Sequence, residues 1–170
     1  MNTNSVRFFN ESVAESPSPH ASLILAVWEI KNPLNMGQII RLAHNAGARK
    51  VLFINETKNI RESKIRKTAG FSCEQMDWEI IPPSDFFSSF PGEYHLVALE
   101  TCEGSQNLFR VTLPEKMLLL AGNESHGLPT EVIAQSQKRV FIPMPGGCKS
   151  MNVAQALSVA SFEWLRQQGC

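Results

Sequence analysis

The chain has 170 residues, of which 43% are apolar and 19% are charged, a balance typical of one soluble globular domain with its own hydrophobic core. The longest apolar runs are far too short to cross a bilayer and the first residues lack the order of a signal peptide, so we expect a cytoplasmic protein without a membrane partner. The four cysteines and four histidines are scattered, which gives no support to a metal site or a disulfide framework.

The formal net charge is zero, but the two signs are separated along the chain. Residues 1–70 carry ten Lys and Arg against five Asp and Glu, residues 71–137 carry two against ten, and residues 138–170 carry four against one. A neutral protein can therefore present one basic and one acidic face, and a basic face concentrates polyanions. Surface charge without a function would give the same counts, so the counts alone leave both interpretations open.

The predicted elements begin after a polar N-terminal stretch. Residues 1–21 predict a flexible arm that precedes a single domain over residues 22–170. Nearly continuous apolar runs predict buried strands at 23–28, 50–54, 78–81, 95–99, 117–121 and 139–143. Helices are predicted at 36–47, 61–69, 84–90, 129–137 and 150–168. This alternation predicts an α/β fold with a mainly parallel sheet flanked by helices.

Three polar loops rich in Asn and Gly follow predicted strands, at residues 29–41, 121–129 and 143–152. Ligands of parallel α/β sheets bind beyond the carboxyl ends of the strands, so the loops predict one site, although Asn and Gly also serve as plain caps and turns. The chain has no P-loop, no GxGxxG fingerprint and no GxSxG elbow. What remains is a pocket of backbone donors and amides with one helical arginine, Arg41, which suits an uncharged or zwitterionic small molecule.

The three loops carry a family resemblance. The stretches NPLNMGQIIRLAHNAGA (32–48), LLLAGNESHGLP (118–129) and IPMPGGCKSMNVAQAL (142–157) resemble, in order and spacing, the three motifs of the SpoU/TrmH-type RNA ribose methyltransferases of the SPOUT superfamily. The stretch SKIRKTAGF (63–71) resembles a substrate-side segment of that family. The resemblance implies a C-terminal trefoil knot, a homodimer and bound S-adenosylmethionine, whose methyl group would pass to a ribose 2′-hydroxyl in tRNA or rRNA.

The same resemblance implies roles for individual residues. Those implied to bind the cofactor are Ala121, Gly122, Asn123, Gly127, Ile142, Met144, Gly146, Ser150 and Met151. Those implied to act in catalysis are Arg41, Asn35, Glu124, Ser150 and Asn152, and those implied to contact RNA are Lys64, Arg66 and Lys67. Close approach of the backbone to the cofactor would be permitted by Gly122, Gly127, Gly146 and Gly147.

Plainer roles for the same side chains stay open. Arg41 could be a solvent-facing helix residue, Glu124 a loop carboxylate, Ser150 a helix N-cap, and the basic residues a solvated face. If Arg41 acts on the substrate, a guanidinium hardly ever loses its proton, so clamping a phosphate and stabilising a developing alkoxide fit better than general-base catalysis.

The C-terminal helix predicts an interface as well as a core contact. One apolar stripe consists of Val153, Leu157, Ala160 and Trp164, and beside it lie Met151, Val159 and Phe162. Core packing uses one stripe, which leaves the other side chains for a second subunit. Many relatives carry an N-terminal RNA-binding domain, whereas about twenty residues precede the match here, so the alternative function is a non-catalytic RNA-binding or assembly module that keeps the fold.

Overall fold

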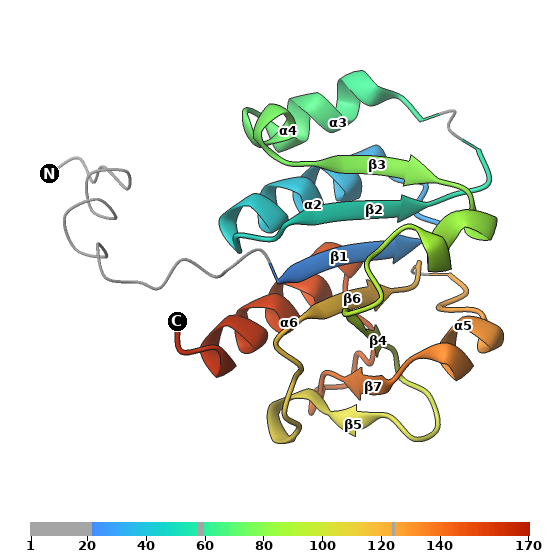
Figure 1. Ribbon diagram of the computed structural model, residues 1–170, viewed down its shortest axis with the longest axis vertical. Coiled ribbons are helices and arrows are strands. Elements are labelled where there is room, and N and C mark those ends of the chain that lie inside the picture. The colour runs from blue at the N-terminus through green and yellow to red at the C-terminus, as the bar shows by residue number, and fades with distance from the viewer. Residues whose placement is uncertain (1–21, 58–59, 124) are drawn as a thin grey trace, which may run out of the picture.

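The computed structural model describes residues 22–57, 60–123 and 125–170 (Figure 1). The predicted N-terminal arm, residues 1–21, lies outside the described residues. The elements are, in chain order, β1 (Leu23–Trp28), α2 (Pro33–Asn45), β2 (Lys50–Ile54), α3 (Glu62–Ala69), α4 (Ser72–Gln75), β3 (Trp78–Ile81), the 3₁₀ helix η1 (Pro83–Ser88), β4 (His95–Leu99), β5 (Gln106–Asn107), the 3₁₀ helix η2 (Leu108–Arg110), β6 (Met117–Ala121), α5 (Thr130–Gln135), β7 (Lys138–Phe141) and α6 (Val153–Gln167).

The strands form one seven-stranded sheet in the order β3-β2-β1-β6-β4-β7-β5, and every neighbouring pair is parallel. The predicted α/β fold with a parallel sheet is therefore confirmed. Strand β1 lies near the middle, where Ile24 is opposite Lys50 of β2 and Leu118 of β6. All six residues of β1 are buried, because helices cover both faces of the sheet.

The core has two layers, one on each face of the sheet. Alternate residues of β1, such as Leu25 and Val27, pack with α2, α3, α4 and α6 on one face. The other alternate residues, such as Ala26 and Trp28, pack with η1 and α5 on the other face (Figure 1). The period-two alternation of strand side chains thus fixes which helices share a layer.

Five predicted strands match the observed bounds, whereas the ends of the predicted helices differ. The helix predicted at 36–47 runs from Pro33 to Asn45, because Asn32 caps it. The strand predicted at 139–143 runs from Lys138 to Phe141, and the helix predicted at 150–168 begins at Val153. The side chain of Asn152, and not that of Ser150, caps this helix by accepting a hydrogen bond from the Ala154 N–H at 2.9 Å. The sequence did not predict α4, β5 and η2, because elements of two to four residues show no periodicity.

The C-terminal half of α6 is hydrogen-bonded to the segment before β6. The Trp164 indole N–H donates to the Pro114 carbonyl at 2.9 Å, and the Gln167 side chain pairs with the backbone of Val111 and Leu113. Glu163, only 8% exposed, accepts hydrogen bonds from Arg166 and Gln167. These bonds hold α6 against the sheet at the end of the chain.

A pH-dependent contribution to stability is expected from Glu163. Its hydrogen bonds with the Arg166 guanidinium lower the pKa of the Glu163 carboxyl from 4.5 to about 2. A carboxyl whose pKa is lower in the folded than in the unfolded state stabilises the fold above about pH 4.5. This stabilisation is lost as the pH falls towards 2. We expect Glu163→Gln to lower Tm by roughly 2–4 °C at neutral pH, the effect of about 1 kcal/mol in a chain of this size. Thermal melts of both proteins from pH 7 to pH 2 test this, and a Tm difference that does not shrink towards pH 2 would contradict the assignment.

None of the helices in the part of the chain that the structure describes is long and apolar enough to cross a membrane.

Candidate functional site

The carboxyl ends of β4, β6 and β7 meet at one edge of the sheet, because these strands are neighbours although other elements separate them in the sequence. The loops that follow them line a pocket of about 240 Å³. The structure brings together at this pocket eight of the nine residues predicted to bind a cofactor, namely Ala121, Gly122, Asn123, Gly127, Ile142, Met144, Ser150 and Met151. The ninth, Gly146, does not line it.

The loop after β6 is closed by a backbone contact between two glycines. A Cβ added to Gly122 would lie 2.2 Å from the carbonyl carbon of Gly127, so only a glycine fits there. Gly127 has a φ of 65°, and the Asn123 side chain accepts hydrogen bonds from the N–H groups of Ser125 and His126, both at 2.8 Å. These contacts bring Gly122 and Asn123 together with residues 125–127 at the wall of the pocket.

Glu100 lines the pocket, and the sequence did not predict it. One carboxylate oxygen accepts a hydrogen bond from the Thr101 N–H and the other from the Leu128 N–H, each at 3.0 Å. A Cβ at Gly127 would lie 2.6 Å from this second oxygen. Glu100 therefore ties the loop after β4 to the loop after β6. Its position directly after a predicted strand was the available signal, but a single carboxylate there is too common to stand out.

Further lining residues were not assigned a role from the sequence, although four of them, Ser125, Lys149, Val153 and Ala156, lie within the second and third motifs. They are Leu99, Thr101, Ser125, Phe141, Lys149, Val153 and Ala156. Among them Lys149 is the one cation in the described lining, and its ammonium donates to the Met144 carbonyl at 2.7 Å. The pocket thus combines apolar walls with one carboxylate and one ammonium.

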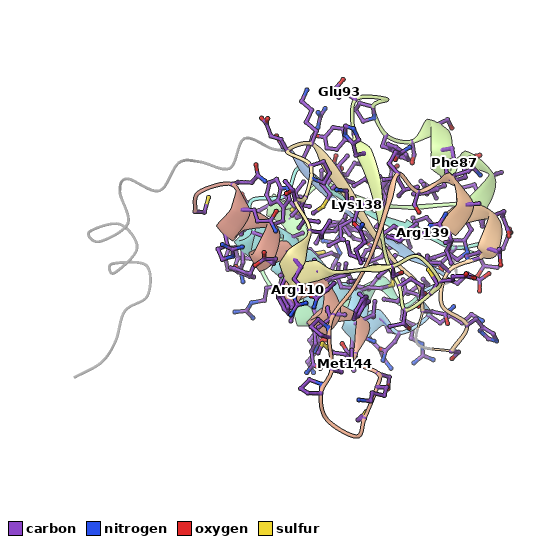
Figure 2. The ribbon with its side chains drawn as sticks, turned by 90° about the horizontal axis from the view of Figure 1, so that it is seen from below. Phe87, Glu93, Arg110, Lys138, Arg139 and Met144 are labelled. Carbon is purple, nitrogen blue, oxygen red and sulfur yellow. The ribbon has the colours of Figure 1, made fainter. Side chains whose placement is uncertain are left out.

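The loop after β7 forms the outer wall of the pocket and projects beyond the sheet, as the position of Met144 in Figure 2 shows. Ser150 lies on this loop, where its carbonyl oxygen accepts a hydrogen bond from the Cys148 thiol at 3.4 Å. A Cβ added to Gly146 or Gly147 would meet nothing within 4 Å, so no described protein group requires glycine at these positions. Their predicted approach to a cofactor stays a prediction.

The residues predicted for catalysis do not all meet at this pocket. The side-chain amide of Asn152 donates a hydrogen bond from Nδ2 to the side-chain Oδ1 of Asn35 at 3.1 Å, joining the start of α6 to the start of α2. Both line a shallow hollow between these helices, together with Asn32, Leu34, Gln38, Ala154, Gln155 and Ser158. Arg41 is exposed on α2 and lines neither the pocket nor the hollow. Glu124 lies outside the described residues.

The residues predicted to contact RNA lie on α3, which packs closely on α2. A Cβ at Gly37 of α2 would lie 2.6 Å from the Thr68 Cβ and 2.7 Å from the Ile65 carbonyl oxygen. Lys64, Arg66 and Lys67 are exposed on the outer side of α3, and Arg66 pairs with Glu62 at 2.9 Å.

The structure does not gather the positive segments on one face. Lys138 and Arg139 belong to β7, next to the edge strand β5 (Figure 2), while α3 lies at the β3 side of the sheet (Figure 1). Within the described ranges, no three His, Cys, Asp or Glu side chains are placed to hold a metal ion. Cys73, Cys102, Cys148 and Cys170 are free thiols.

Comparison with protein families gives one match that spans most of the chain. The SpoU rRNA Methylase family model matches residues 22–162. An uncharacterized tRNA/rRNA methyltransferase of Synechocystis is 28% identical over 156 residues, which are 90% of this chain and 56% of the relative. The mouse tRNA (guanosine(18)-2′-O)-methyltransferase TARBP1 is 27% identical over 95% of this chain, which spans 11% of that protein. The chain thus covers about half or less of these relatives.

A relative of similar length is the tRNA (cytidine(34)-2′-O)-methyltransferase of Burkholderia ambifaria, 29% identical over 87% of this chain and 96% of that enzyme. Among solved structures, an AdoMet-bound rRNA methyltransferase from Sinorhizobium meliloti superposes with a TM-score of 0.78 at 26% identity, over 88% of this chain and 58% of that chain. A structure that concerns 2-OH methylation on tRNA gives a TM-score of 0.77 at 29% identity, over 86% and 96%.

Proposed function

Since this chain belongs to the SpoU rRNA methylase family, we propose that it transfers a methyl group from S-adenosylmethionine to a ribose 2′-hydroxyl of tRNA or rRNA. The observation that carries the proposal is that the second and third family motifs meet at one pocket, within a match over residues 22–162. The Burkholderia relative, whose length this chain nearly spans, is named for 2′-O methylation of a tRNA cytidine. We place the activity in the cytoplasm, the compartment in which tRNA and rRNA are used.

The pocket suits S-adenosylmethionine chemically. This cofactor has a flat adenine ring and an amino-acid end with both charges. Apolar side chains such as Leu99, Ile142 and Val153 would contact the ring, Glu100 would attract the ammonium group, and Lys149 would attract the carboxylate. The close backbone contact between the loop glycines leaves peptide groups at the wall, where they can recognise polar ring atoms. As in the family, the loops after β6 and β7 are proposed to form a trefoil knot around the cofactor.

The role of the protein is to position the ribose and to stabilise charge. S-adenosylmethionine, when bound, supplies a methyl group activated by its sulfonium. Arg41 remains protonated and would bind the phosphate next to the ribose, where it also stabilises the negative charge that develops on the 2′-oxygen. Asn35 and Asn152 hold each other through one hydrogen bond and fix the junction of α2 and α6 beside the substrate. Lys64 and Lys67 would contact further phosphates.

We propose a symmetric homodimer, because Arg41 does not line the pocket of its own chain. A second copy placed against the outer faces of α2 and α6 would bring its Arg41 to the first copy's cofactor. These faces carry exposed apolar side chains, Leu34 at 51% and Phe162 at 53%, on two helices in mutual contact. A stable interface buries about 800 Å² per partner, and twofold symmetry is the commonest arrangement.

The dimer predicts that Phe162→Glu yields a folded but inactive monomer. Phe162 is half exposed, so its replacement leaves the core intact, while a carboxylate in an apolar interface opposes association. Light scattering at micromolar concentration should give half the wild-type mass, with an unchanged circular dichroism spectrum. Trp164→Glu is the contrast, because Trp164 is 1% exposed and this change disrupts the core itself. A Phe162→Glu protein that remains an active dimer would exclude this interface.

The reaction is tested by incubating the protein with isotope-labelled S-adenosylmethionine and total RNA, followed by mass spectrometry of the nucleosides. Label in a ribose-methylated nucleoside is the expected result, and label in a base-methylated nucleoside would refute the proposed chemistry. Calorimetry with S-adenosylmethionine is the companion experiment. RNA binding without any cofactor binding would instead support the non-catalytic module.

A further inference from the structure

The side chain of Phe71 has the highest exposed fraction, 71%, among the large apolar side chains that the structure describes. It lies between α3 and α4, directly after Gly70, which ends α3 with a φ of 62°. Single exposed apolar residues are common on protein surfaces, so exposure alone has no functional meaning. The neighbours of Phe71 are what distinguish it.

The phenyl ring of Phe71 packs against His44 of α2. The rings of Phe71 and His44 lie 5.4 Å apart between centroids at an interplanar angle of 73°, an edge-to-face contact. The His44 Nδ1 is 3.0 Å from the hydroxyl of Ser72, which is buried. His44 therefore supports the phenyl ring from the protein side, while most of the ring surface remains open to solvent.

This supported ring lies near the arginine proposed to act on the ribose. His44 follows Arg41 by three residues on α2, so their Cβ atoms are about 5–6 Å apart. The ring contact with His44 and the contacts of α2 with α3 and α4 place Phe71 at the C-terminal end of α2. A nucleotide whose phosphate binds Arg41 would therefore lie close to the ring of Phe71, which contacts His44.

Exposed charges lie on both sides of Phe71 along the chain, Lys64 and Lys67 before it on α3 and Glu74 after it on α4. Lys64 and Lys67 are exposed, and neither has an ion-pair partner among the described residues. Amines attract phosphates, and an exposed aromatic ring can stack on a flat ring of a ligand. Together they favour a ligand that has both negative charge and flat rings. RNA with unpaired bases has these properties, whereas a duplex keeps its bases stacked inside.

We propose that Phe71 stacks on an unpaired base of the RNA substrate, next to the nucleotide bound by Arg41. The inference rests on the proposed function and adds the class of substrate, an RNA whose target region is single-stranded, such as a loop. Phe71 gives affinity through stacking, with little dependence on base identity, and Lys64 and Lys67 hold the adjoining backbone.

The test compares Phe71→Ala, Phe71→Trp and the control Phe109→Ala in the whole 170-residue chain. Phe109 is similarly exposed, at 50%, but lies on η2. The probes are a hairpin RNA with 2-aminopurine in its loop and a blunt duplex of the same stem, titrated by fluorescence. We expect Phe71→Ala to weaken hairpin binding by roughly 5- to 150-fold and to abolish quenching of the loop fluorophore. Phe71→Trp should restore both, while duplex binding should not change.

Hairpin affinity at the wild-type value in Phe71→Ala would overturn the inference. An equal loss for hairpin and duplex would also overturn it, because stacking requires an unpaired base, and so would conversion of the dimer to a monomer, since Phe71 would then be a subunit contact. Cofactor affinity by calorimetry and methyl transfer by the wild type are measured separately. Their failure would refute the proposed methyltransferase, whereas the Phe71 results report on RNA contact alone.

Discussion

Arg41→Ala is expected to lower kcat by roughly 10²–10³, the loss that follows removal of one donor to a charge that develops in the transition state. The affinity for S-adenosylmethionine should remain at the wild-type value, because the proposed contacts of Arg41 are with the phosphate and the 2′-oxygen of the RNA and not with the cofactor. The fold should also be unchanged, since the side chain is exposed on α2. Single-turnover rates with saturating cofactor and calorimetric cofactor titration measure the two quantities independently.

The matched control is Arg49→Ala. Arg49 is also exposed but follows α2 and lies outside the three motifs, so its loss should leave kcat within about twofold of wild type. Arg41→Lys is informative as well, because lysine keeps the charge but lacks the planar fork that binds phosphate with two hydrogen bonds, so it should recover little activity. If Arg41→Ala weakens cofactor binding as strongly as it lowers kcat, then Arg41 belongs to the cofactor site and the proposed role is wrong.

Gly122→Ala is expected to damage the pocket and the fold together. The new methyl group would lie 2.2 Å from the Gly127 carbonyl carbon. This atom belongs to the backbone, so the clash cannot be relieved by a change of side-chain rotamer. The loop after β6 must therefore move, which costs about 1–3 kcal/mol and lowers Tm by several degrees. A displacement of this kind at the cofactor wall should lower kcat/KM by roughly 10²-fold.

Gly92→Ala is the control for a glycine without close neighbours. A Cβ at this exposed position would meet nothing within 4 Å, so its Tm and activity should equal those of the wild type. Thermal melts and initial rates of both variants make the comparison. Wild-type Tm in Gly122→Ala would show that the loop after β6 has another accessible conformation and that the contact between the two glycines does not shape the pocket.

The sequence by itself determined the family and five of the strands with their bounds. Runs such as 23–28 and 117–121 are continuously apolar because their strands are covered on both faces, and the observed strands have the same bounds. Asn32, which caps α2, and Pro33 in its first turn mark the start of this helix, a signal that the prediction of a helix from residue 36 missed. Residues of the second and third motifs meet at one pocket because the carboxyl ends of parallel strands lie at one edge of the sheet, whereas the first motif does not line it.

Only the tertiary structure decided which distant residues touch. Glu100 accepts a hydrogen bond from the N–H of Leu128, which is 28 residues away in the sequence. Asn152 donates one to the side chain of Asn35, which is 117 residues away. The strand order that makes β4 the neighbour of both β6 and β7 brings the first pair together, whereas the packing of α6 on α2 brings the second. The separation of Arg41 from its own pocket likewise follows from the path of the chain. Periodicity and capping act over a few residues, while such contacts depend on how whole elements pack, which no local pattern contains.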